Sequence, residues 1–185
     1  MLKAIAPFRV VGVDRCLQMI ERSGGVYDRT AEGDFSCFRI EDERFDFIVS
    51  GFDSLNYLST EQLGSFFKSA HSVLKDDGKI IFDYSSPQLL YERWRDMSDR
   101  QTLSQGILDW TMRSKSPSDG CEIVLSWRDF DGKEKWRERH VQFTHDCYQM
   151  HTLAKEAGLV IERVRNWNEQ EFSPSVSTHV YVMGK

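Results

Sequence analysis

Residues that could bind a ligand follow the ends of two strand-like runs in this sequence. Asp14 comes directly after the apolar run at residues 8–13, and Ser50 and Gly51 end the run at residues 45–50. Open α/β sheets bind ligands at the carboxyl ends of their strands. A carboxylate at that edge can accept hydrogen bonds from both hydroxyls of a ribose, but an Asp there can equally cap the helix that follows. The position of Asp14 is compatible with both roles.

Side chains that could face a bound ligand, or act as a base toward it, lie farther along the chain. Asp53, Asn56 and Tyr57 come just after the second run, and His140 and His145 lie in the second half. Histidine can act as a general base near neutral pH because its unperturbed pKa is close to that value. A lone His on a strand is more often a surface or packing residue. The sequence therefore names His140, His145 and Tyr57 as candidates without assigning a base.

The elements that would position these residues alternate between strands and helices. Short apolar runs bounded by turn residues predict strands at residues 8–13, 29–31, 45–50, 79–83, 159–164 and 178–183. Apolar residues three and four apart predict helices at residues 16–22, after Ser59, at residues 88–97, and after Thr144 or Asp146. Ser59 and Gln62 have the spacing of a capping box. This alternation predicts an α/β fold with a parallel, doubly wound sheet.

The second half contains a segment of different character. Two β-prone runs, residues 121–130 and 135–143, are separated by Asp131 and Gly132, which predicts a hairpin. We interpret residues 1–185 as one domain, with residues 85–143 as an insertion. Four of the five tryptophans fall in that insertion, at Trp94, Trp110, Trp127 and Trp136. They could line a pocket for an apolar or planar molecule, or pack the insertion against the sheet.

The composition argues against several classes of binding partner for this protein. A net charge of −5 and a pI near 5.6 argue against a nucleic-acid partner. No apolar run approaches the ~20 residues of a membrane span. The four cysteines are scattered and form no CxxC pair, which argues against a metal site and favours free thiols in a reducing cytoplasm.

Four segments in order resemble the class I S-adenosylmethionine-dependent methyltransferases that act on small molecules. They are VVGVDRCLQMIERS with GVYDRTAEGD, the segment FDSLNYL, the segment FFKSAHSVLKDDGKIIFD, and HTLAKEAGLVIERV with THVYVMGK. The resemblance implies a Rossmann-like sheet, N-terminally truncated, with an antiparallel β-hairpin insertion that covers the acceptor side.

The resemblance also implies a binding site for the cofactor S-adenosylmethionine. Its residues would be Asp14, Gly33, Asp34, Phe35, Ser50, Gly51 and Phe52. Asp34 would meet the adenine amino group and Phe35 would lie against the ring, although an Asp after Gly33 is also typical of a simple turn. Methyl transfer depends mainly on alignment of the reacting groups. A general base is needed only for an acceptor that is protonated at working pH.

One expected feature is missing from the sequence. The family's first strand runs into a Gly-rich turn, and residues 1–7 contain no glycine. That strand lies between the family's second and fourth strands, which correspond here to residues 8–13 and 45–50. Three arrangements are compatible with this departure: the missing piece comes from another segment or polypeptide, the two flanking strands pair directly, or two copies complete each other.

Two functions from different classes follow. The first is S-adenosylmethionine-dependent methyl transfer to O or N of a small molecule. The second is a non-catalytic binding or auxiliary module that has lost the cofactor. A nicotinamide-dependent oxidoreductase is a weaker third reading, because it too would need the Gly-rich turn. Expected partners are a small-molecule acceptor and either a second copy or a partner polypeptide that completes the sheet, with no nucleic acid and no membrane.

Overall fold

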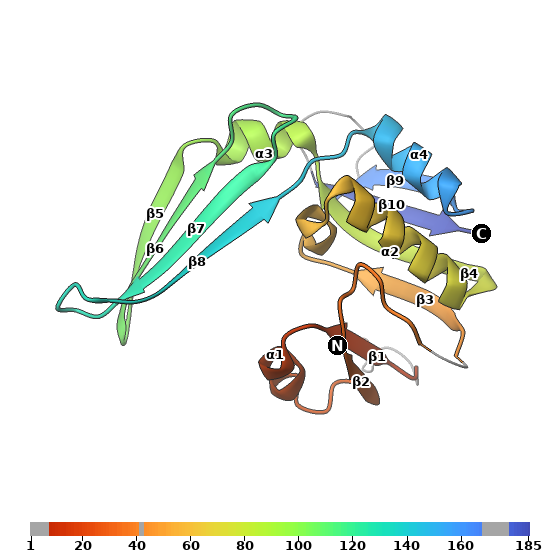
Figure 1. Cartoon of the computed structure of the whole chain (residues 1–185), viewed down its shortest axis with the longest axis horizontal. Coiled ribbons are helices and arrows are strands. Elements are labelled where there is room, and N and C mark those ends of the chain that lie inside the picture. Colours follow the sequence, from red (N-terminus) through yellow and green to blue (C-terminus); the bar gives the residue numbers. More distant parts are fainter. Residues whose placement is uncertain (1–7, 41–42, 168–177) are drawn as a thin grey trace.

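The computed structural model describes residues 8–40, 43–167 and 178–185. Within them the strands form one two-stranded sheet, β1-β2, and two four-stranded sheets, ordered β3-β4-β10-β9 and β5-β6-β7-β8. Figure 1 shows the third sheet as an arm that projects away from the other elements. The predicted α/β class is confirmed. The single sheet expected from the resemblance is instead divided.

The small N-terminal sheet contains β1 (Val11–Asp14) and β2 (Arg29–Glu32), with the short helix α1 (Leu17–Arg22) between them. The two strands are parallel, and Asp14 is opposite Glu32 at their carboxyl ends. The predicted strand at residues 8–13 therefore begins later than expected and includes Asp14. The weak signal at residues 29–31 is confirmed as a strand.

The main sheet is mixed rather than parallel. Its strands are β3 (Phe45–Ser50), β4 (Leu74–Ser85), β9 (Val160–Asn166) and β10 (Thr178–Gly184). β3 and β4 are parallel, but β10 is antiparallel to both β4 and β9. The expectation of a wholly parallel sheet was therefore wrong at β10.

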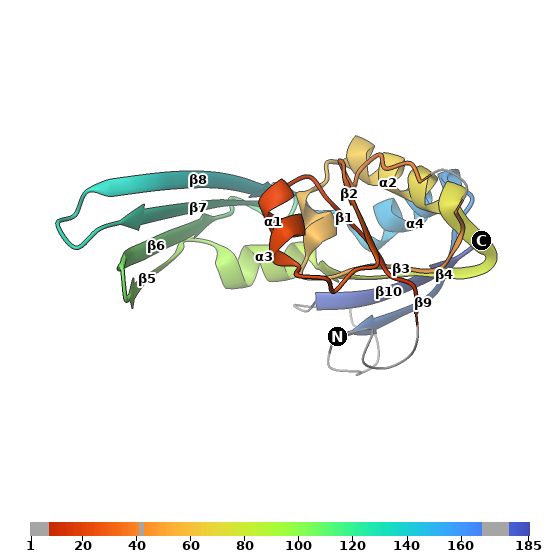
Figure 2. The ribbon, with the colours of Figure 1, turned by 90° about the horizontal axis from the view of Figure 1, so that it is seen from below.

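Two helices cover one face of the main sheet, as Figure 2 shows. They are α2 (Thr60–Val73) and α4 (Cys147–Glu156). Each begins with a capping box, formed by Ser59 with Gln62 and by Asp146 with Gln149. Both helices contribute to a core that also contains buried residues of β4 and β10. No helix within the described ranges is long and apolar enough to cross a membrane.

Alternate residues of β3 face different surroundings. Ile48 packs against the core, whereas Phe47 and Val49 are 52% and 57% exposed. Successive side chains of a strand point to opposite faces, so Phe47 and Val49 lie on the face away from α2. A doubly wound sheet has helices on both of its faces. Here the described helices that pack on the main core, α2 and α4, lie on the same side.

The arm is an antiparallel sheet with more strands than predicted. It contains β5 (Met97–Leu103), β6 (Gly106–Arg113), β7 (Cys121–Arg128) and β8 (Glu134–Gln142), and it follows helix α3 (Pro87–Trp94). The β7–β8 hairpin was predicted, whereas β5 and β6 were missed. Six of the seven residues of β5 are exposed, so the strand has no alternation of polar and apolar residues to reveal it.

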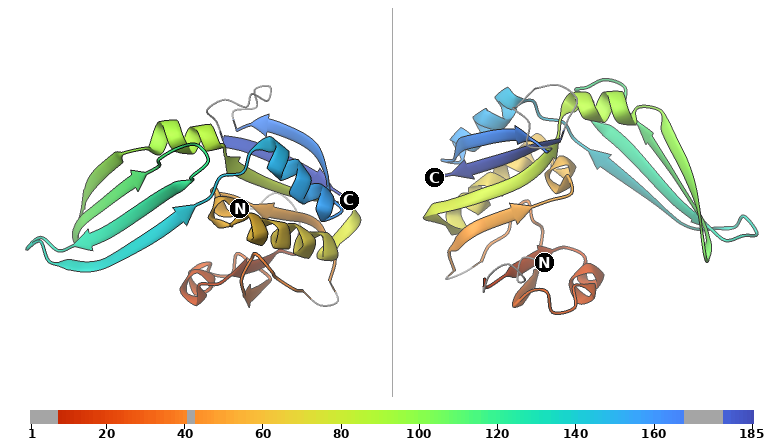
Figure 3. Two further views of the ribbon diagram at one scale, coloured as in Figure 1. Left: turned by 45° about the horizontal axis from the view of Figure 1, so that its top comes forward. Right: turned by 180° about the vertical axis from the view of Figure 1, so that it is seen from behind.

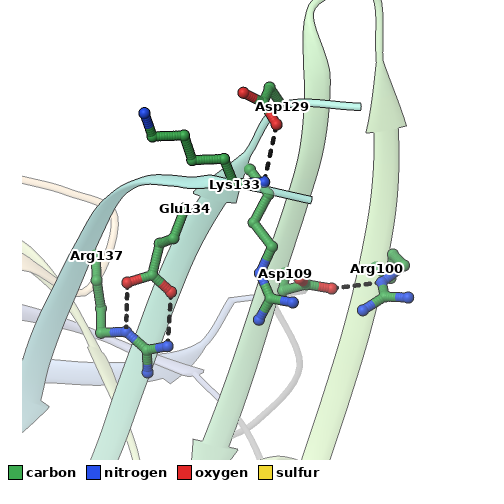
Figure 4. Close-up of polar contacts among 7 residues, drawn as sticks. Arg100, Asp109, Asp129, Lys133, Glu134 and Arg137 are labelled. Atoms are coloured by element: carbon green, nitrogen blue, oxygen red, sulfur yellow. Dashed lines mark hydrogen bonds and ion pairs between the residues drawn. The ribbon is translucent and has the colours of Figure 1, made fainter. Parts of the chain in front are cut away.

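Side chains on the arm are extensively paired (Figure 4). Arg100 donates to Asp109 on the neighbouring strand, and Arg137 makes a two-bond contact with Glu134. At the hairpin tip, the Lys133 backbone N–H donates to Asp129 at 2.8 Å. Exposed pairs of this kind contribute little stability individually. Trp94 and Trp110 lie 6.4 Å apart, centre to centre, beside a small buried cluster at the base of the arm. These two tryptophans therefore pack within the insertion, and their cluster contains no residue of the main sheet.

β1 and β3 do not pair with each other. Each has one hydrogen-bonded strand neighbour within the described part of the chain, β2 and β4 respectively. Figure 3 shows the β1–β2 unit lying apart from β3. The arrangement in which the two flanking strands pair directly is therefore not the one the chain adopts.

Candidate cofactor and acceptor site

A groove of about 360 Å³ lies between β1 and β3. Four of the seven residues predicted to bind a cofactor line it: Asp14, Phe35, Ser50 and Gly51. They come from the ends of β1 and β3 and from the loop after β2, which are far apart in sequence. The groove is where the fold brings the carboxyl ends of these two strands together.

Asp14 has one role that can be seen directly. Its Oδ1 accepts a hydrogen bond of 2.8 Å from the Cys16 backbone N–H, just before α1. Asp14 therefore closes a local turn before the helix, whereas the N-cap of α1 is Cys16 and the helix has no side-chain cap. The same carboxyl group also lines the groove. Because a carboxylate can accept several hydrogen bonds, the local bond and a ligand role are compatible.

Gly33 and Asp34 form the turn that follows β2. The Gly33 N–H donates to the Asp14 carbonyl oxygen at 3.0 Å, which ties this turn to the end of β1. Asp34 is exposed, and its Oδ1 accepts from the Ser36 N–H at 2.8 Å. Hydrogen bonds from the side chain and backbone of Ser36 lower the pKa of Asp34. Asp34 therefore has the turn role, and its contact with adenine stays a prediction.

Phe52 does not contribute to the groove. Its side chain is 97% exposed, and both Phe52 and Asp53 have left-handed backbone conformations, with φ of 58° and 55°. Such conformations are unfavourable for non-glycine residues and persist where surrounding contacts fix them. Asp83 at the end of β4 supplies those contacts, accepting from the N–H groups of Phe52 at 2.9 Å and Asp53 at 3.0 Å.

Asp53 and Tyr57 lie on the far side of this loop, toward the arm. Burial raises the pKa of Asp53, while a 2.8 Å hydrogen bond from the Ser85 hydroxyl opposes that rise. Burial, followed by the nearby Asp53 charge, raises the pKa of Tyr57. The rings of Tyr57 and His140 meet edge to face at 5.9 Å. Asp53, Tyr57 and His140 thus form a polar group beside the base of the arm.

Asn56 is a structural clamp rather than a ligand-facing residue. It is fully buried, and its Nδ2 donates to the carbonyl oxygens of Ser85 at 3.1 Å and Phe143 at 3.2 Å. Its Oδ1 accepts from the Ser85 N–H at 3.0 Å. These bonds join the 3₁₀ helix η2 (Ser54–Tyr57) to the end of β4 and to the segment after β8. The expectation that Asn56 faces a ligand was wrong.

His145 is also structural. It is 2% exposed, its Nδ1 lies 2.7 Å from the Tyr84 hydroxyl, and its Nε2 lies 3.2 Å from the Thr60 hydroxyl. Both ring nitrogens therefore have partners within the core. Of the two candidate histidines, His140 alone lies beside Tyr57.

Burial of His145 predicts a loss of stability in mild acid. Burial lowers the pKa of His145, with the Asp146 charge opposing. Because its folded-state pKa lies below its unfolded value of 6.5, the unfolded chain takes up this proton first as pH falls. The His145 contribution to stability is thus complete above that value and is lost as pH falls below it. Urea unfolding at about pH 7.5 and about pH 5.5 should show a smaller acid loss for His145→Gln than for the original chain. Equal losses would contradict this assignment.

Asp83 and Ser85 are the site residues that the sequence interpretation missed. Asp83 ends the predicted strand at residues 79–83, as Asp14 ends β1, so the same signal was available. Ser85 gave no such signal, because its hydroxyl is significant only through its contact with Asp53.

Solved structures show which fold this chain shares. An S-adenosylmethionine-dependent methyltransferase from Clostridium acetobutylicum superimposes with a TM-score of 0.80 at 22% identity, covering 94% of this chain and 74% of that one. A sugar N-methyltransferase from Streptoalloteichus gives a TM-score of 0.68 at 17% identity, covering 95% and 71%. The fold is the Rossmann-like fold of class I methyltransferases.

Sequence comparisons also find similarity to methyltransferases. Residues 1–78 match a family described as methyltransferase domain. A Geobacillus protein named as a methyltransferase is 27% identical over 145 residues, 76% of this chain and 59% of the relative. YqeM of Bacillus subtilis, also named as a methyltransferase, is 29% identical over 128 residues, 66% and 51% respectively. The first part of this chain is thus similar to methyltransferase domains, and the chain spans between half and three fifths of the length of these two relatives.

Proposed function

We propose that this chain binds S-adenosylmethionine in the groove, at the carboxyl ends of β1 and β3. We propose that it takes part in methyl transfer to O or N of a small molecule. The observation that supports this most strongly is the convergence of Asp14, Phe35, Ser50 and Gly51 on one groove. In this proposal Asp14 accepts from the ribose hydroxyls and Phe35 packs against the adenine ring. The similarity to a sugar N-methyltransferase is consistent with a small-molecule acceptor.

The acceptor would lie beyond the loop that contains Asp53 and Tyr57, with residues 85–143 as the lid on that side. The contact of His140, on β8, with the Tyr57 ring supports this arrangement. Bound S-adenosylmethionine supplies an electrophilic methyl group, so the protein's task is chiefly to align the acceptor and exclude water. His140 is the group available to take a proton from an acceptor that carries one, whereas Tyr57, with its raised pKa, stays protonated and can donate a hydrogen bond. The four cysteines are all free thiols, which supports a reducing, cytoplasmic location.

Calorimetric titration with S-adenosylhomocysteine tests the cofactor site. Asp14→Ala should weaken binding by about 1–3 kcal/mol, the scale of hydrogen bonds to a charged group. Asp14→Asn keeps an acceptor for the Cys16 N–H and so separates the ligand contact from the local turn. Glu32→Ala is the matched control, because Glu32 ends the neighbouring strand opposite Asp14. Unchanged affinity in both Asp14 variants would remove Asp14 from the site.

A second candidate is a non-catalytic module of the same fold, which the separation of β1 from β3 favours within the described residues. Class I cofactor sites use a Gly-rich turn that lets the backbone approach the ligand closely. If the folded 185-residue chain binds no S-adenosylhomocysteine, that result favours the non-catalytic module over the methyltransferase.

A further inference from the structure

The two faces of the arm differ in the side chains that they carry. In an antiparallel sheet, directly paired residues point to the same face, and so do alternate residues along a strand. One face, which we call the aromatic face, therefore consists of the odd-numbered residues of 97–101 and 123–127 and the even-numbered residues of 108–112 and 136–140. None of these residues is Lys or Arg, whereas the residues between them, on the opposite face, include Arg100, Arg137 and Arg139.

Acidic side chains on the opposite face have basic partners. Asp109 lies 2.5 Å from the Nε of Arg100 on the neighbouring strand, a pair that Figure 4 shows. Glu122 lies 2.5 Å from a guanidinium nitrogen of Arg139. The charges of these carboxylates are thus balanced by side chains of the arm itself, so a cation from outside gains little there.

The two acids of the aromatic face, Asp99 and Glu138, lack such partners. Glu138 contacts the Nε2 of His140 at 3.1 Å, and Asp99 accepts a hydrogen bond of 3.2 Å from the Trp110 indole N–H. Neither acid forms an ion pair with Lys or Arg in the part of the chain that the structure describes. The Glu138 side chain is also 59% exposed, so its carboxylate is available to a cation from outside.

Two tryptophans lie beside Glu138 on the outer half of the aromatic face. Trp136 is 42% exposed and pairs across the sheet with Trp127. The Trp127 ring packs against Gly106, where a Cβ atom would come within 2.9 Å of it. A cation over the face of a Trp ring is attracted by the π electrons of that ring. Open rings next to an unpaired carboxylate are therefore suited to an organic cation.

The size of this surface indicates a small molecule rather than a protein. Its two outer rows cross four strands, so they extend about 14 Å across the strands and about 7–10 Å along them. The resulting area is on the order of 100–150 Å², whereas a stable protein interface needs roughly 800 Å² on each partner.

The inner end of the aromatic face adjoins the acceptor side of the proposed site, because the ring of His140 meets that of Tyr57 at 5.9 Å. We propose that the aromatic face binds a small molecule with a protonated amine on an apolar body, and that this amine is the acceptor of the proposed methyl transfer. The role as acceptor rests on the proposed function, whereas the binding does not. Alkyl amines are protonated at neutral pH, as the lysine side chain is. A neutral alcohol would gain neither the carboxylate nor the cation–π contact.

An amine bound as its ammonium must release one proton before its nitrogen has a lone pair to donate. His140, at the inner end of the face, can take that proton. The lone pair then forms the bond to the donated methyl carbon, and the electron pair of the former sulfur–carbon bond remains on sulfur. The transfer therefore needs no further reactant.

NMR titration of the 185-residue chain tests the binding with a matched pair of probes. Phenethylamine and phenethyl alcohol share their apolar body and differ in charge. The indole N–H signals of Trp127 and Trp136 report on the surface, once they are assigned from Trp127→Phe and Trp136→Phe. Both signals should shift with the amine, which is expected to bind about tenfold more tightly than the alcohol. Raising the salt concentration should weaken binding of the amine alone.

Glu138→Gln and Glu122→Gln form a matched pair of variants. Both replace a carboxylate by an amide on exposed positions of the arm, but on opposite faces. Glu138→Gln should weaken phenethylamine binding about threefold and leave phenethyl alcohol unchanged, because it removes the ion pair and keeps the rings. Glu122→Gln should change neither affinity.

The binding proposal fails if the two probes bind equally, or if Glu122→Gln costs as much affinity as Glu138→Gln. It also fails if the two indole signals respond to the concentration of the chain and to neither probe, because a second copy would then cover the face. A chain that binds phenethylamine but not S-adenosylhomocysteine would keep the binding surface and overturn its role as an acceptor site. A chain that binds S-adenosylhomocysteine but not phenethylamine would overturn this inference and leave the proposed function intact.

Discussion

Phe67→Ala is expected to lower the free energy of unfolding by about 3–5 kcal/mol. Phe67 is completely buried on the core face of α2. Its ring lies 5.7 Å from that of Phe66 and 6.0 Å from that of Phe82, which in turn stacks on Tyr181. Truncation would remove the apolar surface and leave a cavity at the point where α2, β4 and β10 meet. Urea or thermal unfolding measures the loss.

Phe52→Ala is the matched control for this prediction. It deletes the same ring from a position that is 97% exposed, and alanine, like phenylalanine, is a non-glycine residue at this left-handed position. Its effect on stability should be within about 0.5 kcal/mol. If the two variants were destabilised equally, Phe67 would not be the core residue described above. A large effect at Phe52 alone would mean that its side chain is covered in solution.

Asn56→Ala is expected to cost about 2–4 kcal/mol, although it removes only a few atoms. Its side-chain amide makes three hydrogen bonds to backbone groups of Ser85 and Phe143. The substitution would leave these buried groups without their partner, and an unsatisfied buried group costs more than an ordinary hydrogen bond contributes. The unfolding free energy should fall, and the connection between η2 and the segment after β8 should loosen.

The neighbouring Ser54 provides the comparison for Asn56. Ser54 lies on the same 3₁₀ helix, and its hydroxyl donates to the Gly51 carbonyl at 2.6 Å, but the contact is exposed to water. Ser54→Ala should therefore change stability by about 0.5 kcal/mol or less. Equal effects at Ser54 and Asn56 would show that burial of the Asn56 network does not determine its energy.

Local sequence patterns were enough to predict much of the fold. The strand at residues 45–50 and the capping box of Ser59 with Gln62 appear as predicted, because both depend on residues close in sequence. The turn at Asp131 and Gly132 likewise separates β7 from β8. In contrast, β5 was missed because it is exposed on both faces and carries no periodic apolar signal.

The roles of individual polar residues depended on partners distant in sequence. Asn56 donates a hydrogen bond to Phe143, 87 residues away. Because of this contact, a residue predicted to face a ligand instead joins η2 to the segment after β8. His145 and His140 are five residues apart in the chain, yet one is buried against Tyr84 and the other lies beside Tyr57. Nothing in their local sequence distinguishes them.

The class of fold and most helix and strand positions could be predicted from sequence alone. The same holds for the location of Asp14, Ser50 and Gly51 at the carboxyl ends of strands. Those features depend on periodicity and on caps and turns, which act over a few residues. The separation of β1 from β3, with an apolar groove between them, could be seen only in the folded structure. Which strand edges pair depends on segments that are distant in sequence and on the space that the packed helices and strands leave.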